Sequence, residues 1–319
     1  MSDGVEARLH AEMTPPFAHE HLVTSGVGPG GELVALWTDA SGIGALRRRV
    51  TEPNGVSYPA LSAERAVPCT ATVRDRGRVR ATALGVGLAN DVVQPLPGGR
   101  LLVAGVRCRL TERGPTPNAA VYDDACRQIP EGALGDGINH LLTTGSGDIW
   151  VGYFDAGVFG NFGWGVGTKP LGASGIARFD DALEQVWTYP GGTHAPPVDD
   201  CYALNVTDTQ VWACYYSDFP VARITGDHVR TWTNDVGAAS AIVAEDTRVA
   251  LFGGYREHRD RLVLGTVTGD HFEPQLATRL TLPDGAPVPR IRPVARGDEL
   301  HLVDGNRWWK VSLDQIGRR

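Results

Sequence analysis

The stretch of residues 135–155, "GDGINHLLTTGSGDIWVGYFD", joins two patterns that rarely occur together. Its second half is an apolar run after a Gly-Ser-Gly-Asp turn, which is typical of a buried strand that follows a hairpin turn. Its first half places Asp136, Asn139 and His140 where another apolar strand begins. The stretch therefore predicts an antiparallel strand pair that opens on a polar cluster.

The same unit recurs along the chain. Each copy is a strand, a tight turn rich in Gly or Asp, and a second apolar strand, and two further strands usually follow it. The copies span 21–39, 91–107, 138–155, 201–218, 240–256 and 291–307. Four antiparallel strands form the blade of a β-propeller. The sequence predicts an all-β fold, a six-bladed β-propeller with four antiparallel strands per blade, as a single domain over residues 1–319.

The last copy has a third strand at 307–313, and the sequence ends before a fourth. Residues 5–13, "VEARLHAEM", alternate apolar and polar side chains as a half-buried strand does. We expect this N-terminal strand to close the last blade as its outer strand, which removes an exposed sheet edge.

Composition excludes several classes of protein. The formal charge is −7, and the longest basic run is Arg47-Arg48-Arg49, so nucleic acid is not expected as a partner. We find neither an apolar run of about 18 residues nor a signal-peptide pattern, so no membrane partner is expected. The five cysteines are odd in number and lack zinc-type spacing. We expect a cytoplasmic protein whose thiols are reduced. We also expect it to be a monomer or a weak oligomer and to bind a small molecule.

Polar residues recur at the start of the first strand of successive copies. In a propeller these strands line the central channel, and the long connections of this chain lie at the same end, which is typical of a binding face. The residues at this position are Glu20, Asn90, Asn139 and Asp200. Their oxygens suit Ca²⁺ or Mg²⁺, and the neighbouring His19 and His21 widen the choice to Zn²⁺ or Mn²⁺.

With these residues the sequence resembles the six-bladed SMP-30/gluconolactonase/luciferin-regenerating-enzyme family. That family has a Glu entering blade one, an Asn-Asp in blade two, an Asn in blade three and an Asp in blade four. Here the same order is held by Glu20, Asn90-Asp91, Asn139 and Asp200. The resemblance implies that Glu20, Asn139 and Asp200 bind the metal, that Asn90 helps to hold metal or substrate, and that Asp200 is the general base.

The function implied is that of a metal-dependent small-molecule hydrolase, lactonase-like, with its site at the mouth of the channel. One divalent cation is expected, with Ca²⁺ preferred and Mg²⁺, Mn²⁺ or Zn²⁺ left open. The side chains expected to contact substrate are Asn90, Asp91, His140, His21, Tyr153, Tyr215 and Arg290. Two alternatives stay open: a non-catalytic ligand- or protein-binding propeller, and a strictosidine-synthase-like enzyme without a metal.

Two finer expectations concern the site. Asp199 and Asp200 are adjacent in a strand, so only one can face the channel. We expect Asp200, because it is nearer the register position of Asn139 and Glu20. The loop 157–167 combines five glycines with Phe159, Phe162 and Trp164. It predicts either a movable aromatic lid or a Gly-rich loop without a ligand.

Overall fold

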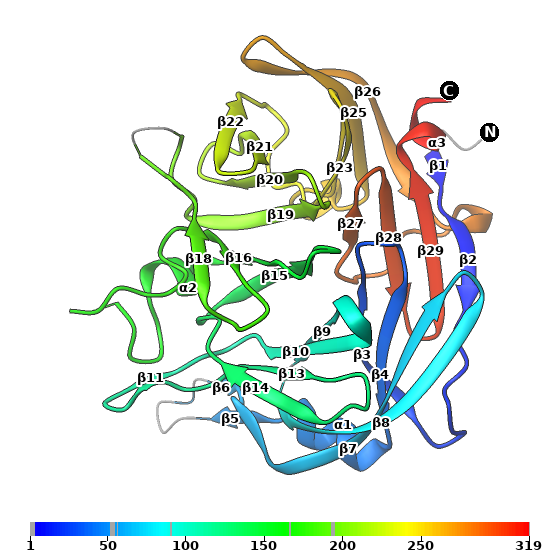
Figure 1. Cartoon of the computed structure of the whole chain (residues 1–319). Coiled ribbons are helices and arrows are strands. Elements are labelled where there is room, and N and C mark those ends of the chain that lie inside the picture. Colours follow the sequence, from blue (N-terminus) through cyan, green and yellow to red (C-terminus); the bar gives the residue numbers. More distant parts are fainter. Residues whose placement is uncertain are drawn as a thin grey trace. The chain divides into compact units, whose positions relative to one another are not determined.

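The structure is a computed structural model that describes residues 4–51, 55, 57–89, 91–165, 167–192 and 195–318, without the side chains of Asp91 and Pro130. The protein is all-β, as the sequence predicts. Its contacts divide the chain into two compact units, one of residues 15–189 and one of residues 1–14 with 190–319. The single domain over 1–319 stays a prediction. Figure 1 shows the strands along the chain.

The unit of residues 15–189 contains three four-stranded antiparallel sheets, each built from strands consecutive in its repeat. The first holds β3 (His21–Val27), β4 (Leu33–Thr38), β7 (Ser62–Asp75) and β8 (Arg78–Leu88). The second holds β9 (Asp91–Leu96), β10 (Arg100–Gly105), β13 (Ala119–Tyr122) and β14 (Gln128–Gly132). The third holds β15 (Ile138–Thr143), β16 (Ile149–Tyr153), β17 (Ile176–Phe179) and β18 (Gln185–Thr188).

Short elements fill the connections of this unit. After β4 come α1 (Ala40–Leu46) and the hairpin of β5 (Arg49–Thr51) with β6 (Ser57–Pro59). The remaining elements are η1 (Pro97–Gly99), the hairpin of β11 (Leu110–Thr111) with β12 (Gly114–Pro115), and α2 (Asp155–Phe159). Helix α1 begins where Asp39 Oδ1 accepts a hydrogen bond from the Gly42 amide at 2.8 Å, a normal N-cap.

The turn between β15 and β16 shows how the Gly-Ser-Gly-Asp sequence acts. The Thr144 amide donates to the Asp148 carbonyl at 2.9 Å, and the Asp148 amide donates to Thr144 Oγ1 at 3.0 Å. Gly147 has φ of 102°, a conformation that other residues adopt only with strain. The turn sets the antiparallel register in which Thr143 faces Ile149, so the strand pair predicted from 138–155 is confirmed.

The other unit holds the remaining sheets. The strands of the fourth repeat are β19 (Asp200–Val206), β20 (Val211–Tyr216), β21 (Val221–Thr225) and β22 (His228–Trp232). Those of the fifth are β23 (Ala241–Glu245), β24 (Arg248–Phe252), β25 (Arg261–Thr268) and β26 (His271–Thr281). Those of the sixth are β27 (Val294–Arg296), β28 (Glu299–Asp304) and β29 (Arg307–Ser312). One parallel pairing, Asn205 with Ala295, joins the fourth and sixth groups in a sheet of eight strands.

The N-terminal segment pairs with two different sheets. Strand β1 (Gly4–Glu6) lies parallel to β26, and β2 (Arg8–Glu12) lies antiparallel to β29. The prediction that this segment supplies the missing outer strand of the last repeat is confirmed for β2. It is corrected for β1, which extends the preceding sheet. Ala7, 1% exposed, is the point of exchange, and its amide donates to the Thr281 carbonyl at 2.8 Å.

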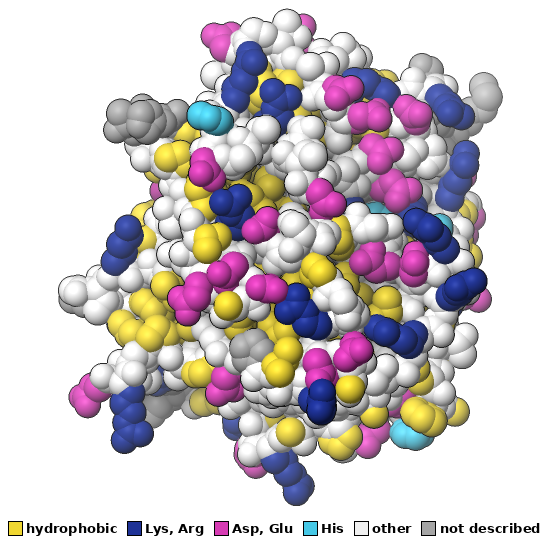
Figure 2. All heavy atoms as spheres, viewed as in Figure 1, with side chains coloured by type: hydrophobic (Ala, Val, Ile, Leu, Met, Phe, Trp, Pro, Cys, Tyr) yellow, Lys and Arg dark blue, Asp and Glu magenta, His cyan; other side chains and the backbone are white. Residues whose placement is uncertain are grey.

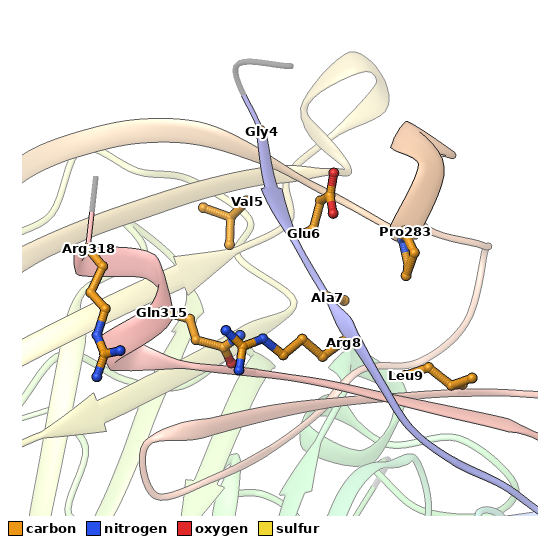
Figure 3. Close-up of a pocket in the computed structure, with 9 residues that line it drawn as sticks. All are labelled: Gly4, Val5, Glu6, Ala7, Arg8, Leu9, Pro283, Gln315 and Arg318. Atoms are coloured by element: carbon orange, nitrogen blue, oxygen red, sulfur yellow. The ribbon is translucent and has the colours of Figure 1, made fainter. Parts of the chain in front are cut away.

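The short helices of this unit are η2 (Arg256–His258), η3 (Pro283–Gly285) and α3 (Leu313–Gly317). In Figure 3 the N-terminal segment crosses a pocket of about 550 Å³ between α3 and η3, with the Arg8 side chain directed toward Gln315. Among the described residues, no helix is both long enough and apolar enough to cross a membrane.

Hydrophobic cores lie between consecutive sheets. Val34, Leu36, Val93 and Val103 belong to a core shared by the first and second sheets. Equivalent cores join the second sheet to the third, the fourth repeat to the fifth and the fifth to the sixth. Each sheet between two others is therefore apolar on both faces, which explains the nearly continuous apolar runs of the second strands.

Candidate functional site

Glu20 is a buried carboxylate at the entrance to β3. It is 8% exposed, and Thr70 Oγ1 from β7 donates to its Oε1 at 2.7 Å. The other oxygen, Oε2, is buried and has no hydrogen-bond partner among the described residues. Burial of a carboxylate oxygen without a donor is costly, so such an oxygen is a candidate cation ligand.

Three repeats have a β-bulge near the start of their first strand, and these bulges allow the repeats to be aligned residue by residue. The extra residues are Val23 in β3, Asn139 in β15 and Tyr202 in β19. Counting back three residues from each bulge gives Glu20, Asp136 and Asp199. These acids, and not Asp200, occupy equivalent positions in their repeats.

In the fourth repeat, Asp199 and not Asp200 therefore occupies the register position of Glu20, and the choice of Asp200 as the channel-facing acid stays a prediction. Asp200 lies two residues before the bulge at Tyr202, whereas Glu20 lies three residues before the bulge at Val23. Asp200 instead matches His21, which also starts its strand. Asp200 is half-buried, and His21 is exposed.

The other predicted site residues are distributed as follows. Asn139 and His140 are half-buried in β15, and Arg290 is exposed before β27. Asn90 lies outside the described residues, and Asp91 is described only as the first backbone position of β9. Glu20, His21, Asn139 and His140 belong to the unit of residues 15–189, whereas Asp200 and Arg290 belong to the other unit.

Tyr153 and Tyr215, expected as substrate contacts, are both completely buried. The Tyr153 hydroxyl donates to the Leu134 carbonyl, and the Tyr215 hydroxyl donates to the Pro196 carbonyl at 3.2 Å. Burial raises the pKa of Tyr153 well above its usual value. Both rings pack in the interior and both hydroxyls are hydrogen-bonded to backbone carbonyls, so the two side chains are not accessible to a substrate.

Asp136, the first polar residue of the stretch 135–155, forms a buried ion pair. Arg107 donates through Nε and an Nη to both carboxylate oxygens at 2.7 Å, and the Cys108 amide donates to Oδ1 at 2.9 Å. Arg107 and Asp136 are 8% and 3% exposed. Bidentate geometry of this kind fixes both side chains. Sequence reasoning missed Arg107; its one signal was a charged residue two positions after the end of a buried strand.

The loop expected to form a lid is attached to residues 108–110. Trp164 is buried, and its Nε1 donates to the Cys108 carbonyl at 3.0 Å. The Leu110 amide donates to the Phe162 carbonyl at 2.9 Å. Gly163 has φ of 90°, and a Cβ there would overlap the Leu110 carbonyl oxygen. Of the three aromatic residues, only Phe159 is exposed. These contacts therefore favour a fixed loop over a lid in which all three residues move.

The cysteines are free, and four of the five are buried. Burial raises the pKa of the Cys108 thiol to about 11 and that of Cys214 to about 12. These two thiols are therefore neutral and poor nucleophiles near pH 7.

A divalent cation is partly compatible with these residues. The buried Oε2 of Glu20 is a suitable hard ligand, and Asn139 and Asp200 carry oxygens of the same type. In the described part of the chain, however, no three His, Cys, Asp or Glu side chains are grouped so as to hold a metal. A site built on Glu20 would need amide or backbone oxygens as well.

The pocket shown in Figure 3 is lined by residues 4–9 with Pro283, Gln315 and Arg318, none of them a predicted site residue. The face in view in Figure 2 carries interspersed acidic and basic side chains and no extended basic tract.

Comparison with known proteins gives distant likenesses. A YxzG family model matches residues 176–248, less than a quarter of the chain. No curated protein matches the sequence.

Three solved structures illustrate the structural likenesses. The extracellular domain of the putative one-component system BT4673 from B. thetaiotaomicron is 10% identical, with TM-score 0.44, covering 97% of this chain. The chain spans 42% of that relative's length. An inactive virginiamycin B lyase from Staphylococcus aureus with quinupristin is 11% identical, with TM-score 0.39 and coverage of 96% and 99%.

The Neurospora crassa Pan2 WD40 domain is 9% identical, with TM-score 0.47 and coverage of 96% and 94%. At these identities and TM-scores, the activities of the three proteins do not indicate the activity of this chain. The strand pairing of this chain itself defines its all-β fold.

Proposed function

We propose that the repeats form a six-bladed β-propeller and that the protein is a metal-dependent hydrolase of small molecules, lactonase-like, with its site at the channel mouth. Two features support the propeller: four-stranded antiparallel order in each of the first five repeats and hydrophobic cores between consecutive sheets within each unit. The pairing of β2 with β29 supports ring closure, because it joins the start of the chain to the last sheet.

The observation that carries the enzymatic proposal is the Glu20 carboxylate. Thr70 fixes one of its oxygens, and the other is buried without a donor among the described residues. Glu20, Asn139 and Asp200 would hold the cation, which when bound supplies Lewis acidity toward a carbonyl group. Asp200 would accept a proton as general base, and the resemblance of the Glu-Asn-Asn-Asp order supports this assignment.

The test is metal analysis of the purified full-length protein after dialysis against Ca²⁺, with elemental mass spectrometry as the readout. We expect about one equivalent in the wild type and a clear loss in Glu20→Gln, which keeps the shape and removes the charge. Asp75→Asn is the matched control, because Asp75 is an exposed acid on β7, the strand that holds Thr70. Hydrolysis of a panel of aliphatic lactones should follow the metal content.

One observation favours the non-catalytic alternative. Asp136, at the position equivalent to Glu20, is fully engaged by Arg107 and the Cys108 amide. Acids at this position can therefore serve to fix loops. Wild-type protein that binds no divalent cation and hydrolyses no lactone would leave a ligand-binding propeller, or a strictosidine-synthase-like enzyme without a metal, as the better proposal.

A further inference from the structure

We propose that a pocket between the β5–β6 hairpin and the loop around Phe162 binds a small organic anion with a flat apolar body. The pocket has a volume of about 240 Å³ and is lined chiefly by Arg48, Val50, Tyr58, Leu61, Arg109 and Phe162. All of these residues belong to the unit of residues 15–189. The inference goes beyond the proposed hydrolase, because none of the residues assigned to the metal or to catalysis lines this pocket.

The charge of the pocket is positive in a chain whose net charge is −7. Among the described residues, its lining contains two guanidinium groups and no acidic side chain. Arg109 is exposed and forms no ion pair within the described ranges. Arg48 lies 3.9 Å from Glu64, but both side chains are largely exposed, so this pair contributes little. Arg109 has no ion-pair partner in the described part of the chain and Arg48 has only this exposed one, which favours an anionic ligand.

The aromatic wall of the pocket is held in place before a ligand binds. The Tyr58 and Phe162 rings lie 5.0 Å apart at an interplanar angle of 65°. Cζ of Arg107 lies 4.4 Å from the Phe162 ring centroid, and Asp136 fixes Arg107 through two hydrogen bonds. The hydrogen bond from the Leu110 amide to the Phe162 carbonyl also holds Phe162 in place. A wall fixed in this way loses little conformational entropy on binding.

Size and chemistry define the class of ligand. Pockets that take drug-sized ligands have volumes of roughly 300–1,000 Å³, so this one suits a smaller molecule. Guanidinium groups bind both carboxylate and phosphate oxygens, often through two parallel hydrogen bonds. The rings and Val50 and Leu61 favour a flat apolar body beside the anionic group. An aryl carboxylate and an aryl phosphate share this chemistry.

Isothermal titration calorimetry on the full chain tests the inference, with EDTA present so that the metal site does not contribute. The probes are benzoate and phenyl phosphate, with benzyl alcohol as the neutral analogue and inorganic phosphate as the anion without a ring. We expect the two aryl anions to bind, and benzyl alcohol and inorganic phosphate to bind at least tenfold more weakly. Whichever aryl anion binds more tightly identifies carboxylate or phosphate as the natural group.

The decisive variant is Arg109→Gln, with Arg113→Gln as control, because Arg113 is exposed in the adjoining β11–β12 hairpin and does not line the pocket. Losing one charge-assisted contact should weaken aryl-anion binding roughly tenfold or more in Arg109→Gln and leave it unchanged in Arg113→Gln. Both residues are exposed, so both variants should fold, which circular dichroism verifies. Equal affinity for benzoate and benzyl alcohol, unchanged affinity in Arg109→Gln, or no binding of either aryl anion would overturn the proposal.

Discussion

Two adjacent carboxylates stand at the start of the fourth repeat, and they differ in their surroundings. The Asp199 amide donates to the Tyr216 carbonyl at 2.8 Å, and its Oδ2 lies 3.5 Å from the Ser217 hydroxyl. Asp200 is the first residue of β19 and faces Tyr216 across the sheet. Because Asp199 occupies the register position of Glu20, comparing variants of Asp199 and Asp200 shows which of these two acids serves the site.

If Asp200 is metal ligand and base, Asp200→Asn should lower metal content and reduce lactone hydrolysis by about 100-fold or more, because the charge and the basic oxygen are both lost. Its circular dichroism spectrum should stay that of the wild type. Asp199→Asn should have a smaller effect on both readouts. A larger loss in Asp199→Asn than in Asp200→Asn would transfer the role to Asp199, the position equivalent to Glu20.

His301 gives a second prediction at this scale, because it is a buried histidine in β28. It is 1% exposed, and its Nδ1 accepts a hydrogen bond from Trp308 Nε1 at 3.2 Å. Burial first, then the charges of Lys310, Arg296 and His10, lower its pKa well below 6.5. Nε2 lies 3.7 Å from a Glu299 oxygen that also pairs with Lys310. The folded protein therefore keeps this imidazole neutral.

The unfolded chain binds a proton at His301 below pH 6.5, whereas the folded protein resists protonation. The stability contribution is complete above pH 6.5 and falls as pH decreases, by up to about 2 kcal/mol at pH 5. His301→Gln should lose this part of the pH dependence of the unfolding free energy in urea titrations between pH 5 and 7.5. His228→Gln, at an exposed position in β22, is the control. An unchanged slope in His301→Gln would contradict the assignment.

At the scale of elements, the N-terminal segment stabilises two sheets. Removing residues 1–13 exposes the edges of β26 and β29 and deletes the buried side chains of Val5, Ala7 and Met13. Burial of one Val or Met side chain contributes roughly 1.5–3 kcal/mol, so the melting temperature should fall sharply. Removing residues 1–6 deletes β1 alone and should give an intermediate loss. Equal melting temperatures for the full chain and both truncations would disprove the closure.

The loop at Phe162 gives a second prediction for an element. Gly163→Ala places a Cβ against the Leu110 carbonyl oxygen in a backbone with φ of 90°, so the attachment of the loop should be lost. Gly167→Ala is the matched control, since φ is 74° there but nothing lies within 4 Å of the added Cβ. Quenching of tryptophan fluorescence by acrylamide should increase in Gly163→Ala, because Trp164 is buried in the wild type. A similar increase in Gly167→Ala would mean that φ strain alone loosens the loop.

Much of the element structure follows from the sequence, because alternation and turn residues are local signals. The Gly-Ser-Gly-Asp turn and the apolar strands beside it fix the β15–β16 hairpin. Three details depend on nonlocal packing and could not be predicted. The bulges at Val23, Asn139 and Tyr202 add residues that alternation does not show. The N-terminal segment changes its partner strand at Ala7 because the edges of β26 and β29 both lie beside it. The Arg107–Asp136 ion pair joins a residue that follows the second sheet to one that precedes the third.

For the whole molecule, metal binding and stability should be linked. A ligand that binds only the folded state stabilises it by about 2.7 kcal/mol at 100 times its dissociation constant. If Glu20 holds a cation, EDTA should lower the melting temperature of the wild type and have little effect on Glu20→Gln. Differential scanning calorimetry with and without added Ca²⁺ measures this difference. The same shift in both proteins would place any bound cation elsewhere.

The pairing of Arg8 with Lys310 also bears on the order in which the protein can be assembled during translation. The segment of β2 leaves the ribosome roughly 300 residues before its partner strand exists, and closing so long a loop is a slow, nonlocal step. The residues of β2 are thus among the last to reach their native place. Ribosome-stalled chains ending near residue 300 should leave residues 8–12 open to protease, and protection of these residues should appear only when β29 has emerged from the exit tunnel.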